Sequence, residues 1–136
     1  MNTLLERRQL IKPSSAKHKG RRFQQQVCKA FLEIGKRYGL VAGDIKSTSM
    51  GVSGVDVQFS PQAQRALGDI AVECKNVEAL SVATTFSEHA AKYPGFLALL
   101  FHTRNRTEPM VTLRMKDFMQ ILAGWLANPE AKDITE

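Results

Sequence analysis

Two short stretches of the chain, residues 54–59 and 69–75, alternate apolar and polar side chains with the period of a half-buried β-strand. Asp56 occupies a polar position in the first stretch, and Glu73 occupies one in the second. Side chains two residues apart lie on the same face of a strand, so Glu73 and Lys75 are expected to point the same way. If the two strands pair antiparallel, these three side chains converge on one patch.

The rest of the pattern predicts an α/β fold in the order helix, three strands, helix, two strands, helix. Apolar residues at helical spacing predict helices over about residues 16–37, 80–92 and 114–127. Three further strands are predicted at about 44–49, 96–101 and 110–113. The continuous apolar run at 96–101 is typical of a central strand covered on both faces.

Turn and cap residues divide these elements. Ser14 or Ser15 is expected to cap the first helix, and Gly39 and Gly43 to end it. The segment 60–68 is predicted to be a turn-rich link that folds the second carboxylate strand back on the first.

Length and composition predict one domain. The chain has 136 residues, 43% of them hydrophobic, which suits a single core over residues 15–128, between a flexible basic arm at 1–14 and a tail at 129–136. An apolar run long enough for a membrane span is missing, and residues 1–13 do not have the pattern of a secretory signal. Cys28 and Cys74 lack metal-type spacing and suggest buried free thiols, as expected of a cytoplasmic protein in a reducing compartment.

The positive charge is concentrated at the start of the chain. Residues 1–22 hold seven basic groups and one acidic group, which accounts for the whole formal net charge of +6. Such a block contacts phosphates without sequence preference; the alternative is a solvated tail. The predicted phosphate contacts at the helix entry are Lys17, Lys19, Arg21 and Arg22. A second possible group is Arg104, Arg106 and Arg114.

Two carboxylates and an ammonium group on one patch suit a Mg²⁺ ion with a cation beside the reacting group. The alternative is that Asp56, Glu73 and Lys75 simply face water. The three histidines have no zinc-type spacing and are assigned structural or surface roles; they are His18, His89 and His102.

An Asp followed by (D/E)xK on a strand pair resembles the signature of the PD-(D/E)xK, or restriction-endonuclease-like, nucleases. Within that superfamily the chain is most similar to the small Holliday-junction resolvases of archaea and related phage nucleases. The likeness covers about residues 17–120. It depends on KGRRFQ at 19–24, KSTSMG at 46–51, GVD at 54–56 and VECK at 72–75. It implies an αβββαβ core with a mixed central sheet flanked by helices.

The resemblance also implies residue roles. Asp56 and Glu73 would bind Mg²⁺, or Mn²⁺ as the alternative ion, with the Cys74 carbonyl as a further ligand and without a small-molecule cofactor. Lys75 would stabilise charge on the phosphate. The family often has a Glu on the first helix where this chain has Gln24, although Gln25 or Gln26 could be the equivalent position. Ser47, Ser49 and Ser53 lie where the resolvases carry a serine-containing loop that approaches the scissile phosphate, and the resemblance leaves open which of them contacts DNA. Lys46 would also contact DNA.

Three functions of different classes follow. The first is a Mg²⁺-dependent, structure-selective DNA endonuclease resembling a Holliday-junction resolvase, which would work as a C2 homodimer because a four-way junction needs two cuts. The second is a DNA-binding module that keeps this fold without cleavage, as the replacement of an acid by Gln24 suggests. The third is a small interaction protein whose basic arm binds a partner protein.

Overall fold

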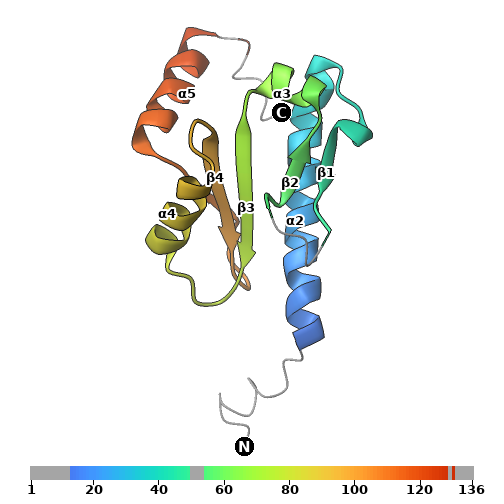
Figure 1. Ribbon diagram of the computed structural model, residues 1–136, viewed down its shortest axis with the longest axis vertical. Coiled ribbons are helices and arrows are strands. Elements are labelled where there is room, and N and C mark those ends of the chain that lie inside the picture. The colour runs from blue at the N-terminus through green and yellow to red at the C-terminus, as the bar shows by residue number, and fades with distance from the viewer. Residues whose placement is uncertain (1–12, 50–53, 129, 131–136) are drawn as a thin grey trace, which may run out of the picture.

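The computed structural model describes residues 13–49, 54–128 and 130. It is an α/β structure with two small sheets beside one long helix (Figure 1). Helix α2 (Pro13–Gly35) packs against strands of both sheets, and helix α4 (Val82–Lys92) packs on strand β4 (Leu97–Thr103). The predicted arm at 1–14 and tail at 129–136 fall almost entirely outside the described residues.

Helix α2 forms one wall of the core. Phe23, Val27 and Phe31 are buried, at the four-residue spacing that places side chains on one helix face. The helix begins at Pro13, which is favourable in a first turn because its missing N–H needs no partner there. Ser14 and Ser15 therefore lie inside the helix, and the prediction that one of them caps it is wrong.

The chain leaves α2 through two short 3-10 helices, η1 (Lys36–Tyr38) and η2 (Ala42–Asp44). Gly39 has a φ of 77° at the end of η1, a conformation that glycine adopts without strain. Strand β1 (Ile45–Ser47) then pairs antiparallel with β2 (Val57–Phe59) in a two-stranded sheet.

The link at 60–68 contains a helix, α3 (Pro61–Leu67), where the sequence pattern predicted turns. The Ser60 hydroxyl accepts the Ala63 N–H at 3.1 Å and caps the start of α3. Pro61 occupies the first turn, and Gly68 follows the end with a φ of 93°. Ser, Pro and Gly are turn residues as well as helix boundary residues, and here the boundary role prevails.

Strand β3 (Ile70–Asn76) pairs in parallel with β4, and β5 (Met110–Thr112) pairs antiparallel with β4. Helix α4 makes the crossover that two parallel strands require. The expected antiparallel pairing of the two carboxylate strands is wrong: β2 pairs with β1, and β3 pairs with β4. The segment before β2 reaches the other edge of β3 through Asp56, whose N–H donates to the Val72 carbonyl. The described strands thus form two sheets, and the expectation of one mixed central sheet holds only for β3, β4 and β5.

Strand β4 is the central strand of its sheet, as predicted from its apolar run. Ala98, Leu99 and Leu100 are buried. Helix α5 (Met115–Ala127) also forms where a helix was predicted, but none of its residues is buried. Among the described helices, none has both the length and the apolar character to cross a membrane.

Candidate active site

Asp56, the residue just before β2, is hydrogen-bonded to the free edge of β3. Its backbone N–H donates to the Val72 carbonyl at 2.9 Å, and its carboxylate Oδ2 accepts the Cys74 N–H at 2.7 Å. Its own carbonyl accepts the Thr48 N–H at 2.9 Å. Asp56 therefore connects the two sheets, and its side chain lies against the strand that carries Glu73.

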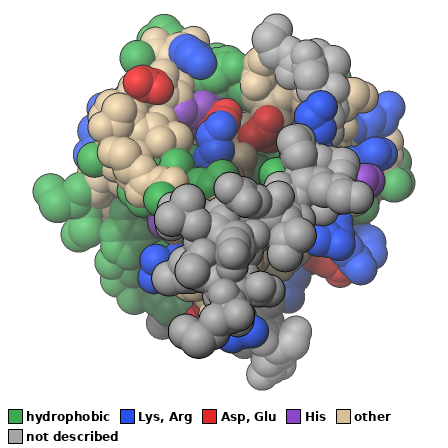
Figure 2. Space-filling model, turned by 90° about the horizontal axis from the view of Figure 1, so that it is seen from below, with side chains coloured by type: hydrophobic (Ala, Val, Ile, Leu, Met, Phe, Trp, Pro, Cys, Tyr) green, Lys and Arg blue, Asp and Glu red, His purple; other side chains and the backbone are tan. Residues whose placement is uncertain are grey.

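Glu73 and Lys75 lie on the same face of β3, as alternation predicts. Lys75 Nζ is 3.3 Å from Glu73 Oε1. The side chain of Glu73 is 22% exposed, so it is partly buried and still accessible to solvent. Figure 2 shows acidic, basic and histidine side chains gathered on this end of the molecule.

The charges of this cluster act on Asp56. Burial raises the pKa of the Asp56 carboxyl, and the nearby charge of Glu73 raises it further. The Cys74 N–H, Lys75 and His89 oppose that rise in pKa because they favour the charged carboxylate. The structure therefore brings Asp56, Glu73 and Lys75 together. The contact is the hydrogen bond from the Cys74 N–H to the Asp56 carboxylate, not the pairing of two strands.

His89 joins this cluster from helix α4, and the sequence pattern did not single it out for a functional role. The side chain is buried, and Nε2 lies 2.9 Å from the Ala71 carbonyl. A carbonyl can only accept, so Nε2 donates and the lone pair of a neutral ring is on Nδ1. That Nδ1 lies 3.9 Å from Glu73 Oε2. Because 16 residues separate Glu73 from His89 along the chain, no local spacing indicates the contact.

Gln24 is buried beneath the same region, and its amide has a structural use. Nε2 donates to the Thr48 carbonyl at 2.6 Å and to the Asp56 carbonyl at 2.8 Å. Both N–H groups thus point to the end of the β1–β2 pair where β1 ends and β2 begins. A carboxylate cannot make these bonds, which gives a physical reason for an amide where the resembling family often has an acid. Gln25 and Gln26 are exposed and make no comparable contact with the residues that the structure describes.

Oxygen atoms of the type that binds divalent cations lie at this edge. The N–H and C=O of one strand residue point to the same edge, so the Cys74 carbonyl faces the edge where its N–H meets Asp56. Asp56, Glu73 and this carbonyl are oxygen donors, the type that Mg²⁺ prefers, and Mg²⁺ usually keeps several waters. In the described parts of the chain, no three His, Cys, Asp or Glu side chains gather as a metal-binding group.

The Cys74 side chain does not belong to this oxygen set. Its sulfur packs against the hydrophobic core, and burial raises the pKa of the thiol. Cys28, the other free cysteine, is also half-buried with a raised pKa. Both thiols are held in the form that is neither nucleophile nor metal ligand.

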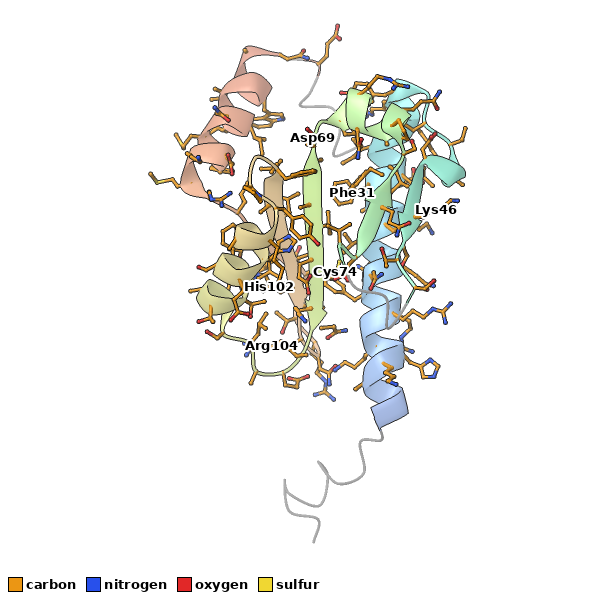
Figure 3. All side chains as sticks on the ribbon, in the orientation of Figure 1. Phe31, Lys46, Asp69, Cys74, His102 and Arg104 are labelled. Atoms are coloured by element: carbon orange, nitrogen blue, oxygen red, sulfur yellow. The ribbon has the colours of Figure 1, made fainter. Side chains whose placement is uncertain are left out.

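The predicted DNA-contacting residues that the structure describes lie in two clefts and at two further exposed positions. Arg21, Ser47 and Ser49 line one polar cleft of about 350 Å³ together with Gln25 and Thr48. A second cleft contains Lys19 and Arg22. Lys46 is exposed on β1, on the far side of β2 from Cys74 (Figure 3). Lys17 is exposed on α2, and Ser53 lies outside the described residues.

Comparison of the chain with protein-family models, with curated proteins and with solved structures found no match. The case for a function therefore comes from the geometry of these residues.

Proposed function

We propose that this chain is a divalent-metal-dependent nuclease that hydrolyses phosphodiester bonds in DNA. The observation that carries the proposal is the cluster of Asp56, Glu73 and Lys75 at the free edge of β3. Two carboxylates with an adjacent ammonium group suit the joint binding of a cation and a phosphate. Lys19 and Arg22 of α2 line a cleft with Asn76 at the end of β3 and suit a polyanionic substrate.

Each residue has a distinct role in this proposal. Asp56 and Glu73 would hold Mg²⁺ or Mn²⁺, with the Cys74 carbonyl as a third oxygen donor. The ion, when bound, supplies Lewis-acid activation of the phosphate and the attacking water. Lys75 would place its positive charge against the phosphate oxygens as negative charge develops on them. His89 would act as a positioning residue, because its ring borders Glu73 from the buried side.

Gln24 favours a second candidate, a DNA-binding module without cleavage. Its amide donates to two backbone carbonyls and leaves the metal without the helix acid that the resembling nucleases often provide. This candidate predicts binding to DNA that weakens steeply with salt and is unaffected by removal of the metal.

Branched DNA is the proposed substrate, and a homodimer is the proposed assembly. Helix α5 supplies a surface for a second copy: Met115 is 80% exposed, Phe118 47% and Met119 52%. With Ile121 and Leu126, these side chains offer on the order of several hundred Å² of apolar surface, the scale of one side of a stable interface. The charges of α5, Lys116 and Asp117, lie in its first turn, so two copies can meet without burying like charges at the centre.

The direct test compares the wild type with Asp56→Ala on four-way, flap and linear DNA, with Mg²⁺ and with EDTA. We expect cleavage of branched DNA by the wild type with Mg²⁺ alone and none by the variant. The matched control is Asp69→Ala, which removes an exposed acid at the other end of β3 and should leave cleavage intact (Figure 3). Salt-sensitive binding without cleavage under every condition would support the second candidate instead.

A further inference from the structure

A second basic cleft lies on the other side of α2 from Arg21 and Ser47. It has a volume of about 520 Å³ and opens between the first turns of α2 and the loop that joins β4 to β5. Lys19 and Arg22 line it from the helix, and Arg104 and Arg106 line it from the loop. Figure 3 shows Arg104 at the same end of the molecule as the first turns of α2.

The loop that carries the two arginines is held in place by hydrogen bonds. Thr107 N–H donates to the Arg104 carbonyl at 3.2 Å, which closes the turn. The Thr103 hydroxyl donates to the Thr107 carbonyl at 3.0 Å, and Asn105 N–H donates to Glu78 Oε1 at 3.1 Å. A loop ordered in this way presents its cations without a large entropic cost on binding.

Two features of the cleft have no explanation in the fold alone. Arg106 has a φ of 60°, a backbone conformation that strains a non-glycine residue, so a glycine would be favoured there on stability alone. The buried Oδ1 of Asn76, which lines the same cleft, lacks a hydrogen-bond partner among the described residues. An acceptor without a donor is costly when buried, so this side chain lowers the stability of the fold beside the cleft.

The alternative interpretation of these basic side chains is that they are solvated surface cations without a ligand. Glu78 Oε1 is 3.6 Å from Lys19 Nζ and offsets one of the four charges. Arg22, Arg104 and Arg106 are exposed, and none has an ion-pair partner in the part of the chain that the structure describes. Three like charges around one concave surface repel each other, and a bound polyanion relieves that repulsion.

We propose that this cleft binds the sugar-phosphate backbone of a nucleic-acid strand, as a site separate from the Asp56 cluster. Phosphates would lie between Arg22 and the two loop arginines. Side chains alternate along β3, so Asn76 lies on the opposite face from Lys75. A nucleic-acid strand in the cleft and a second one at Lys75 would therefore lie on opposite faces of β3 near its end, as two arms of a branched substrate would. The inference rests on the proposed function for the identity of the polymer and for the second nucleic-acid strand at Lys75.

The test is the salt dependence of DNA binding by the full chain carrying Arg104→Ala and Arg106→Gly together. Glycine suits the backbone at 106, so the substitution removes a cation and keeps the turn. The matched control is Arg65→Ala with Lys92→Ala, two exposed cations away from the cleft. Helix α3, which carries Arg65, lies at the opposite end of the molecule (Figure 1).

Each phosphate contact contributes about 0.9 to the slope of log affinity against log salt for duplex DNA. We expect the loop variant to reduce that slope by about 1 to 2 on a four-way junction, while the control keeps the wild-type slope. Equal slopes in the loop variant and the control would overturn the proposal. A second titration with inorganic phosphate separates a polymer site from a small-anion site. Binding of inorganic phosphate that is lost in the loop variant, together with unchanged binding of the junction by that variant, would also overturn the proposal.

The salt titration and the cleavage assay together distinguish the cleft proposal from the nuclease proposal. A reduced slope in the loop variant with no cleavage by the wild type would support the cleft and count against the nuclease. Cleavage by the wild type with an unchanged slope in the loop variant would support the nuclease and reject the cleft.

Discussion

The Asp56 carboxylate accepts the backbone N–H of Cys74 at 2.7 Å. This bond fixes one carboxylate oxygen against β3 and leaves the other for a further partner. It also places Asp56 beside Glu73, whose charge contributes to the raised pKa of Asp56. Two acids held this close without a cation repel each other, which is the electrostatic condition that a divalent ion relieves.

Replacement of Asp56 by Asn should stabilise the ion-free protein at neutral pH. The folded state raises the pKa of this carboxyl, so it holds the proton more tightly than the unfolded chain does. Its contribution to the free energy of unfolding is present below the unfolded pKa and is lost as pH rises through the folded pKa. Asn cannot ionise and still accepts the Cys74 N–H. Urea unfolding in EDTA should therefore give Asp56→Asn a higher midpoint than the wild type at pH 7, with the difference shrinking in acid.

Added Mg²⁺ provides the complementary measurement on the same variant. The ion should raise the urea midpoint of the wild type, because it binds the folded state, and should leave Asp56→Asn unchanged. Asp69→Asn should respond to Mg²⁺ as the wild type does. A lower midpoint for Asp56→Asn than for the wild type in EDTA at pH 7 would contradict this account.

Replacement of Lys75 by Met should separate chemistry from ion binding. The ammonium group lies 3.3 Å from Glu73 and is not itself a metal ligand. We expect the single-turnover rate on branched DNA to fall by about 10²- to 10³-fold, the usual range for loss of one charge-stabilising group. The stabilisation of the folded state by Mg²⁺ should persist. Lys92→Met, at an exposed lysine in the last turn of α4, should retain the wild-type rate, and equal losses in both variants would argue against a role specific to Lys75.

Replacement of Gln24 by Glu should destabilise the fold. A carboxylate would face the Thr48 and Asp56 carbonyls, which would both lose a donor and meet a negative charge. We expect a loss of about 2–4 kcal/mol in the free energy of unfolding at pH 7 without divalent ions. The loss should shrink in acid, where the carboxyl is protonated and can donate.

Gln25→Glu is the matched control for that substitution, one residue along the helix on an exposed position. Its free energy of unfolding should stay within about 0.5 kcal/mol of the wild type. Equal stability of the two Glu variants would refute the structural role of the Gln24 amide. Recovery of Gln24→Glu by Mg²⁺ would instead place position 24 within reach of the ion, as in the family that the sequence resembles.

Replacement of Phe118 by Glu should dissociate the proposed dimer. Phe118 lies on α5, a helix with no buried residue, and a carboxylate there would be desolvated in an interface between two copies. Light scattering at tens of micromolar protein should give the mass of a dimer for the wild type and of a monomer for the variant. Gln120→Glu adds the same charge at an exposed polar position of α5 and should remain dimeric. A monomeric wild type would remove the proposed role of this surface.

Local pattern predicted the elements of the candidate site more reliably than their pairing. Alternation placed Glu73 and Lys75 on one face of β3, and that placement is confirmed because side-chain direction within a strand depends only on neighbouring residues. The antiparallel pairing of the two carboxylate strands was wrong. Pairing is a competition among all strands, and β1 and β4 are the partners that the compact structure provides. Helix α3 was missed because Ser60, Pro61 and Gly68 suit a turn as well as a short helix.

Residues far apart in sequence account for what no local pattern could show. His89 reaches Glu73 only because α4 folds across β4, and Arg104 faces Arg22 only because a loop meets the start of α2. The chain alone therefore dictates the helices, the strands and the direction of the acidic side chains, through steric and hydrophobic preferences that act over a few residues. Packing of the helices and sheets decides which of those side chains meet, since burial and hydrogen bonding are satisfied only by the molecule as a whole.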